Sequence, residues 1–546
     1  MDMNLEGKYT PKDFASIMDM KIPPKKPATD FAPPPPPQQP ADFEAAIKAT
    51  GFGRFNILLL AAAFPAMLAG VIETAVISFI LPSAECDLDL SLMDKGILNA
   101  ITSCGMISSS LAWGYLADTK GRKGIMVWGC LVNVIFVLWS AMSQSRIELI
   151  IAKFFSGFVI SGPFSVLMPY ITEFHGCNYR SRITMIIGTM ISIGAVLLPV
   201  LALLILPNDW NFLLGNIQFN SWRIYLAICG IPSLLGGLVL LGFPETPRFL
   251  MTKGRNEEAL KVFRTMYAMN TKNSKETYSI SELKNDFPTH QPEEDNVKVT
   301  GITEINLTKN PLQGQTGPFK LLFSKSYISL TLRVLTLKFF MLFGKNTLRL
   351  WLPQLFASIN EYEQISSDAT SLCTILEYSV NKTEIITNPE ETCIVIITPS
   401  TYANNIVVSC VICVAFLAAG TLINKLGEKR MQVITLLICA VCGFTLYWSS
   451  STVTTLIISS TYISMGTIAM TALIGASVNL FPTSSRTIIV SSSMSCGLIG
   501  TILGNILFPI FMAMGCIPPI VMLGGVMFFA AILAYSLPST KKSELK

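Results

Sequence analysis

Several ionisable residues lie within runs of apolar residues that are long enough to cross a membrane. Glu73 lies in one such run, and Lys338, Lys345 and Arg349 lie together in another. A charge inside a bilayer is costly and marks a functional site by default. The spacings of seven and four residues place the three cations along one helical face. We therefore expect them to face a central cavity.

These charges predict the binding of a solute. Lys338 or Lys345 would attract an anionic or hydroxyl-rich solute, while Glu73 neutralises the cation in the empty state or carries a coupling proton. A permanent Glu–Lys bridge between two halves of the protein is the structural alternative. Lys153, in a third apolar run, is a further candidate or a side chain that snorkels to the outer interface. Trp351 is suited either to stack on a sugar or to anchor the interface.

Enzyme chemistry has little support in this sequence. The two histidines, His175 and His290, show no zinc-ligand spacing, and there is no phosphate-binding glycine loop or nucleophile elbow. We expect no enzyme activity, no cofactor, no metal site and no direct use of ATP.

The elements that must position these residues are membrane helices. The chain is 51% hydrophobic and 14% charged, whereas about a quarter of residues are charged in ordinary soluble proteins. Spans of roughly 20 residues predict an all-α polytopic membrane protein of about twelve helices in two six-helix bundles. The expected spans are 55–82, 97–117, 125–143, 148–168, 183–206, 222–243, 328–356, 400–423, 431–449, 453–476, 486–511 and 514–537.

A short charged turn between two spans occurs twice, about half a protein apart, and indicates a duplication. Glycines at such a turn permit close helix approach and a chain reversal, and its acid can pair with the following cations or cap a helix. The copies are Gly114-Tyr-Leu-Ala-Asp118-Thr-Lys-Gly121-Arg122-Lys123-Gly124 and Gly420-Thr-Leu-Ile-Asn424-Lys-Leu-Gly427-Glu-Lys-Arg430. Asn424 stands where the first copy has Asp118, so one acid of the pair is missing.

Other charged residues at the same predicted membrane face suggest a gate. They are Glu173, Arg180, Arg182, Glu245 and Arg248. Bonds among them and the turn would lock this face shut. Ordinary interfacial ion pairs, each worth little, are the alternative.

The distribution of cations predicts the topology. Lys and Arg collect in the two turns, in residues 245–326 and near Lys541, whereas the alternate connections have few. The positive-inside rule makes the basic side cytoplasmic, so both termini are expected inside. The net charge of +5 thus reflects the membrane, and no nucleic-acid partner is expected. No charged-then-apolar leader begins the chain, so no cleavable signal peptide is expected.

The expected domain organisation follows these spans. Residues 1–50, with a proline run, predict a disordered cytoplasmic tail. The six-helix bundles are 51–243 and 327–537, with a cytoplasmic loop carrying short helices at 244–326, an external loop at 357–399 and a tail at 538–546.

The external loop holds two cysteines and a sequon. Cys373 and Cys393 share the loop, where an oxidising compartment would bridge them. Asn381-Lys-Thr383 lies between them, on the correct face for glycosylation.

The two turns resemble the signature loop of the major facilitator superfamily. Further matches resemble its synaptic vesicle glycoprotein 2 and SVOP-like branch, which is related to sugar and organic-ion porters. They are Gly51-Phe-Gly-Arg54-Phe55, Ser78-Phe-Ile-Leu-Pro82-Ser-Ala-Glu85, Trp222-Arg223, Pro244-Glu245-Thr246-Pro247-Arg248-Phe249 and Trp351-Leu-Pro353-Gln-Leu-Phe356. The external loop is short, whereas the vesicle glycoproteins carry a large lumenal domain there.

The resemblance implies a function. Helices one, four, seven and ten line the path in this superfamily, which is where Glu73, Lys153 and the three cations fall. We expect a monomeric transporter in the lipid bilayer, secondary active or facilitative, that moves a small polar or anionic organic solute by alternating access, with a proton or sodium ion as the candidate coupling ion. The alternative is a non-transporting vesicle membrane protein that acts through partners. Plasma membrane and vesicle membrane both remain open as locations.

Overall fold

The computed structural model describes residues 40–208, 210–214, 217–284, 322–325, 327–365, 371–386, 398–482 and 485–538. These ranges are almost entirely helical, with one two-stranded hairpin. The elements are α2 (Phe43–Ala49), α3 (Arg54–Glu73), α4 (Val76–Ala84), α5 (Leu92–Lys120), α6 (Arg122–Met142), α7 (Arg146–Thr172), α8 (Cys177–Ile205), β1 (Asn211–Leu214), β2 (Ile217–Asn220), α9 (Ser221–Cys229), α10 (Ile231–Leu240), α11 (Pro247–Thr252), α12 (Asn256–Thr271), α14 (Ile328–Ile365), α15 (Leu372–Ile386), α16 (Pro399–Leu426), α17 (Glu428–Thr445), α18 (Thr452–Leu480), α19 (Arg486–Ala513) and α20 (Ile517–Tyr535).

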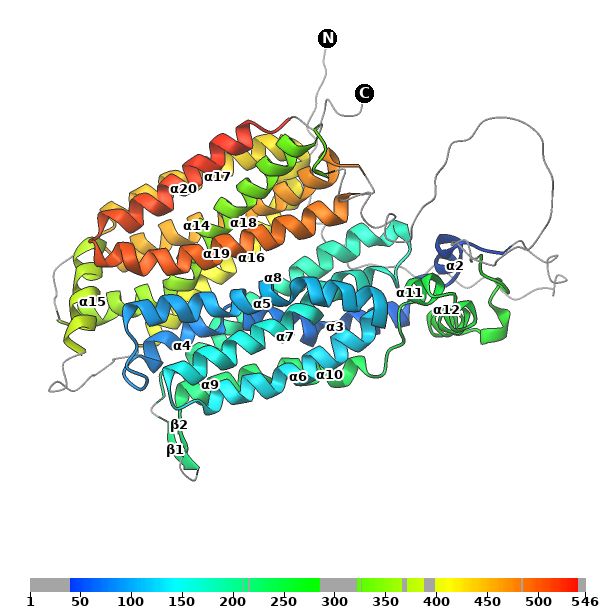
Figure 1. The fold of residues 1–546 in the computed structure, drawn as a ribbon, viewed down its shortest axis with the longest axis horizontal. Coiled ribbons are helices and arrows are strands. Elements are labelled where there is room, and N and C mark those ends of the chain that lie inside the picture. Colours follow the sequence, from blue (N-terminus) through cyan, green and yellow to red (C-terminus); the bar gives the residue numbers. More distant parts are fainter. Residues whose placement is uncertain are drawn as a thin grey trace, which may run out of the picture.

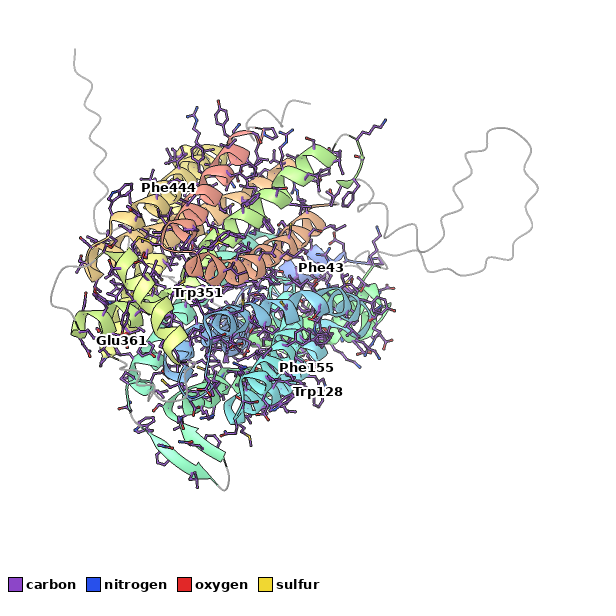
Figure 2. The ribbon with its side chains drawn as sticks, turned by 60° about the vertical axis from the view of Figure 1, so that its left-hand side comes forward. Phe43, Trp128, Phe155, Trp351, Glu361 and Phe444 are labelled. Atoms are coloured by element: carbon purple, nitrogen blue, oxygen red, sulfur yellow. A yellow bond between two sulfur atoms is a disulfide. The ribbon has the colours of Figure 1, made fainter. Side chains whose placement is uncertain are left out.

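The helices are long and apolar enough for a membrane. Ten candidate spans occur in the described residues, with α9 and α10 counted as one, and α5 and α14 add 29 and 38 residues of helix. Apolar side chains also cover the outer surface, for example Trp128 at 65% exposure and Phe444 at 37% (Figure 2). Helices that are apolar on every side need a lipid environment. The protein is therefore an all-α, multi-pass integral membrane protein.

The helices form two bundles. The N-terminal half runs from α3 to α10 and the C-terminal half from α14 to α20, and the two lie against each other in Figure 1. They meet mainly where α5 packs on α19 and α8 packs on α16. One buried cluster fills the C-terminal half, whereas two others belong almost wholly to the N-terminal half.

The two ends of the bundle carry different small elements. The turn end, defined by Gly121 at the junction of α5 and α6, is the end where α2, α11 and α12 gather (Figure 1). The hairpin end, defined by β1 and β2, also carries α15 (Figure 1). The short helix expected in the loop after the sixth span lies in α12.

Two expected spans are broken. The span 55–82 divides into α3 and α4, because Ala75 leaves helical geometry with φ of −138°. The span 222–243 divides at Gly230, between α9 and α10. The first break places Glu73 at the last position of α3.

The prediction of a disordered tail over residues 1–50 is wrong for its last part. Residues 1–39 lie outside the described residues, but α2 follows directly. Asp42 caps it by accepting from the Ala45 amide at 2.8 Å. Phe43 and Ile47 are buried, and the Tyr278 hydroxyl donates to the Ala46 carbonyl at 2.7 Å. The burial of these apolar side chains orders the segment.

The expected external loop 357–399 is also partly helical. Helix α14 continues to Ile365, and α15 occupies Leu372–Ile386. The expected span ended at residue 356, whereas α14 contains Pro353 and runs nine residues beyond that end. The sequon residue Asn381 lies within α15, and its glycosylation stays a prediction.

The disulfide prediction is wrong. Cys373 is bonded to Cys516 and not to Cys393, which lies outside the described residues. Cys516 directly precedes α20, although it lies inside the expected span 514–537. Helix α15 returns the chain across the end of the bundle, so a partner 143 residues away is nearer than the sequence suggested.

Replacing Cys516 by Ser should destabilise the C-terminal half. Closing a long loop restricts the unfolded chain, and a disulfide typically contributes about 2–4 kcal/mol to the free energy of unfolding. Thermal unfolding of the purified protein in detergent measures the loss as a lower midpoint. Cys410→Ser, at a free and exposed cysteine, is the control. An equal shift in the two variants would contradict the structural role of the bond.

Candidate functional site

The first turn is held by one carboxylate. Glu245, between α10 and α11, accepts from the backbone amides of Arg122 at 3.1 Å and Lys123 at 3.1 Å. It therefore caps the start of α6, where unpaired amides and the helix dipole favour an anion. Gly121 has φ of +96°, and a β-carbon there would collide with the Glu245 carboxylate. Glycine is thus required both by the reversal and by the cap.

An arginine extends this cap to a third helix. Arg122 pairs with Glu173 at 2.8 Å, and its guanidinium also donates to the Thr246 hydroxyl at 3.2 Å. Burial raises the pKa of Glu173 above its ordinary value, and the neighbouring Arg122 opposes that rise. The network joins α6, α7 and α11, all within the residues before 253.

The remaining predicted gate residues divide into two groups. Arg180 pairs with Glu44 of α2 at 2.6 Å, and the Arg248 guanidinium lies over the Phe43 ring at 5.6 Å. Asp118 and Arg182 are exposed. Asp118 makes no hydrogen bond or ion pair within the described ranges, so the expected pairing of Asp118 with Arg122 or Lys123 is wrong. Glu245 occupies that place instead.

Gly114 does not permit a close approach of helices in this conformation. A β-carbon at Gly114 would meet no heavy atom within 4 Å, and its neighbours Leu111 and Tyr115 are exposed. The prediction of a close helix contact at Gly114 is therefore wrong for this state. This face of α5 is uncovered at the turn end.

The second turn keeps the backbone of the first and changes its chemistry. Gly427 has φ of +78° and separates α16 from α17, as Gly121 separates α5 from α6. Glu428 follows it and accepts from the Asn479 amide at 2.9 Å, across to the end of α18. Arg430 is exposed. Gly420 and Asn424 lie in α16, and their side chains fall outside the description.

Glu73 forms a buried ion pair. Its Oε1 lies 2.7 Å from the Lys153 Nζ of α7, and both side chains are almost completely buried. Lys153 therefore does not snorkel to an interface. Glu73 therefore does not neutralise Lys338, and it does not form a bridge between the two halves. Both of these expectations are wrong for this conformation.

The three cations of α14 lie without acids beside them. Lys338 is fully buried, and its Nζ has no hydrogen-bond partner. The Lys345 Nζ reaches the Met470 sulfur at 3.4 Å. No ion pair of Lys338, Lys345 or Arg349 occurs in the part of the chain that the structure describes. A buried ammonium without an anion is costly, so this basic face suits an acceptor supplied from outside.

Trp351 of α14, labelled in Figure 2, belongs to the buried cluster of the C-terminal half. It is buried, and its ring packs against Phe508 at 5.1 Å between centroids. It faces a cavity towards the hairpin end with Glu85 and Lys95. Trp351 is therefore not an interfacial anchor, and its spacing of two residues from Arg349 and six from Lys345 places it on another face of α14.

Sequence reasoning missed two buried ion pairs near the hairpin end. Lys95 pairs with Glu85 at 2.6 Å, and Arg223 pairs with Asp87 at 2.6 Å. Lys95 precedes the expected span 97–117, but α5 begins at Leu92 and includes it. Ser91 and Asp94 form a capping box, a sequence signal that would have moved the helix start.

Comparisons with known proteins agree with this architecture. A model of the sugar (and other) transporter family matches residues 66–360, more than half of the chain. The chain belongs to this transporter family. Synaptic vesicle glycoprotein 2A from Homo sapiens is 28% identical over 335 residues, which cover 59% of this chain and 45% of that protein. Synaptic vesicle glycoprotein 2B from Rattus norvegicus is 30% identical over 247 residues, covering 44% of this chain and 36% of that one.

Solved structures share the fold. The partially occluded, inward-open conformation of the E. coli xylose transporter XylE matches with a TM-score of 0.60 and 16% identity, covering 89% of this chain and all of that one. An inward-facing bacterial homologue of the lysosomal transporter Spinster matches with a TM-score of 0.57 and 13% identity, covering 89% and 95%. The major facilitator fold and the likeness to the vesicle glycoproteins are thereby confirmed. The matched region covers less than half the length of these vesicle glycoproteins.

Replacing Glu245 by Gln should destabilise the turn end. The amide keeps the shape but loses the negative charge that the amides of α6 favour, at a cost of about 0.5–2 kcal/mol. Thermal unfolding in detergent measures the effect. Glu282→Gln changes an exposed side chain and is the control. An unchanged midpoint for Glu245→Gln would refute the cap.

The pair of Glu73 and Lys153 should behave as one unit. Either Glu73→Gln or Lys153→Met alone leaves a buried charge without its partner, which costs about 3–5 kcal/mol. The double variant removes both charges and should recover most of the loss. Unfolding midpoints of the four proteins form the double-mutant cycle. Additive losses would show that the two side chains are not coupled.

Proposed function

We propose that this protein is a secondary active or facilitative transporter that moves a small polar or anionic organic solute by alternating access. The observation that carries the proposal is the Lys338 ammonium, which is fully buried with no hydrogen-bond partner in the described residues. The names of the family and of the XylE structure supply the transport class. The unpaired cations of α14 indicate the class of solute, which is polar or anionic.

The solute site is the basic face of α14. Lys338, Lys345 and Arg349 occur there without a carboxylate, and burial strengthens the attraction of an unpaired cation for an anion. Glycines bring a neighbouring helix close, because a β-carbon at Gly497 would lie 3.2 Å from Cγ of Lys338. An anion at this face would offset the cost of burying the ammonium.

Glu73 has a different part in this proposal. Its partner is Lys153 of the same half, at 2.7 Å, so it leaves the α14 cations free for solute. A coupling proton would have to displace Lys153 from this carboxylate. The candidate coupling ions are a proton and a sodium ion.

The conformation suits one state of such a cycle. At the hairpin end the halves are joined, because Gln354 donates to Glu85 at 3.3 Å and Tyr402 donates to the Phe79 carbonyl at 3.3 Å. At the turn end, Leu111 and Tyr115 of α5 are uncovered. By the positive-inside rule we assign the turn end, the basic loop and both termini to the cytoplasm. The protein is then closed outward and open inward.

The resemblance to the vesicle glycoproteins favours a second candidate. The second turn places Asn424 where the first has Asp118, and the curated relatives are named as vesicle glycoproteins. A membrane protein of vesicles that acts through partners would retain the fold and lose the transport cycle. Folded protein that takes up no solute would favour this candidate.

Lys338→Met should lower uptake about tenfold or more without destabilising the protein. Removing a buried charge that has no partner is neutral or stabilising, whereas a solute that pairs with it loses about tenfold or more in uptake. Proteoliposomes assayed with sugars, carboxylates, nucleotides and organic cations give the uptake, and thermal unfolding gives the stability. Lys284→Met, at an exposed lysine, is the control. Normal uptake by folded Lys338→Met would refute the proposed site.

A further inference from the structure

The hairpin of β1 and β2 projects sideways from the bundle, between the ends of two membrane spans. One candidate span ends at Ile205 and the next begins at Ser221, and the hairpin connects them. In Figure 1 it leaves the start of α9 and points across the direction of the helices, away from the bundle. In Figure 2 it again reaches past the neighbouring helices. The hairpin therefore extends over the bilayer leaflet at this end of the protein.

The register of the strands gives the hairpin two different faces. Successive residues of a strand point to opposite faces, and the register pairs Phe212 with Phe219 and Asn211 with Asn220. Phe212 and Phe219 thus share one face, which we call the aromatic face. On the other face the Gln218 amide donates to the Asn211 side-chain oxygen at 3.3 Å. The hairpin is therefore amphipathic.

The hairpin exposes apolar side chains and has no charge among them. Phe212 is 59% exposed, Leu213 on the polar face is 78% exposed, and Trp210 is exposed at the base. Residues 210–222 include no Asp, Glu, Lys or Arg, and Arg223, which follows them, is buried. Large exposed apolar side chains of this kind mark a contact with a membrane or a protein.

The bundle supports the hairpin only at its base. The Ser221 hydroxyl accepts from the Trp210 amide at 3.1 Å and donates to the Asn208 carbonyl. An isolated two-stranded hairpin is at best marginally stable in water and needs a hydrophobic face packed against another surface. The exposed aromatic face would gain that surface from lipid.

The open edges of the strands limit how deep the hairpin can lie. Each edge of a two-stranded sheet presents backbone N–H and C=O groups without strand partners. Such groups are not tolerated in the hydrocarbon core, where no water can pair with them. The headgroup region offers both water and apolar contact, and tryptophan is enriched there.

We propose that the hairpin is an interfacial anchor, which lays its aromatic face on the leaflet at the hairpin end, among the lipid headgroups. Because residues 210–222 carry no charge, the contact comes from the burial of apolar surface and not from attraction to anionic lipids. The anchor holds the hairpin and the start of α9 at the membrane surface. This inference does not depend on transport.

The test places a fluorescent residue, dansylalanine, in the hairpin of the full-length protein by codon suppression, in vesicles of phosphatidylcholine. Phe212→dansylalanine changes an exposed side chain and so leaves the bundle core intact. We expect blue-shifted emission. Phosphatidylcholine with a spin label on its headgroup should quench the probe more strongly than a spin label at the chain terminus, or iodide in the water. Phe219→dansylalanine, on the same face, should behave alike.

The matched control lies on the opposite face of the same hairpin. Gln218→dansylalanine should show red-shifted emission and be quenched mainly by iodide, because that face points to water. Vesicles of anionic phosphatidylglycerol should give the same pattern at low and high salt, since the hairpin carries no charge. Thermal unfolding of each variant confirms that it is folded.

Three results would overturn the proposal. Iodide quenching at positions 212 and 219 that equals quenching at position 218 would place the hairpin in water. Protection of positions 212 and 219 from both iodide and spin-labelled lipid would show that protein, such as a second copy of this chain, covers the aromatic face. Lipid quenching that requires phosphatidylglycerol and disappears in salt would make the contact electrostatic. A protein that shows the expected quenching but transports nothing would refute the proposed function and leave this inference intact.

Discussion

A charge buried in a membrane-embedded bundle must find a counter-charge, and the two halves of this protein meet that constraint differently. The ion pairs found in the described residues all involve residues between 44 and 258, and the most buried are Lys153 with Glu73 and Lys95 with Glu85. The described part of the C-terminal half contributes cations on α14 and no acid to pair with them. The most buried charges of the N-terminal half thus have partners within that half, and in the proposed function a solute supplies the counter-charge to the α14 cations.

The charged network at the first turn lies within one half of the protein. Glu245, Arg122 and Glu173 join elements of a single half, so separation of the halves would leave these bonds intact. They stiffen the N-terminal half and cannot by themselves close the turn end. In the second turn, a carboxylate at Glu428 and an amide at Asn479 stand where the first has Arg122 and Glu173. The two turns therefore share their backbone geometry and differ in their charges.

The sequence predicted the features that one helix displays by itself. The spans, the single face of Lys338, Lys345 and Arg349, and the need for Gly121 follow from local spacing and composition. The partner of Glu73 could not be predicted, because Lys153 lies 80 residues away and three cations of α14 were equally plausible. The bond from Cys373 to Cys516 was missed for the same reason. Pairing across a bundle depends on how two helices cross, and the sequence of neither helix alone determines that crossing.

For the proposed alternating access, the contacts at the hairpin end have a suitable strength. The halves are joined there by hydrogen bonds such as Gln354 to Glu85, Tyr402 to the Phe79 carbonyl and Ser83 with Tyr402. Each contributes about 0.5–1.5 kcal/mol net to stability. A few of them therefore stabilise the state that is closed at the hairpin end by a few kcal/mol. Moving a two-state equilibrium from 1:99 to 99:1 requires about 5.5 kcal/mol of differential affinity. One charged contact between a solute and α14 supplies a large part of that. Since these bonds use hydroxyl, amide and carbonyl groups with one carboxylate, opening them exposes few new charges, and the ion pairs of the N-terminal half need not break.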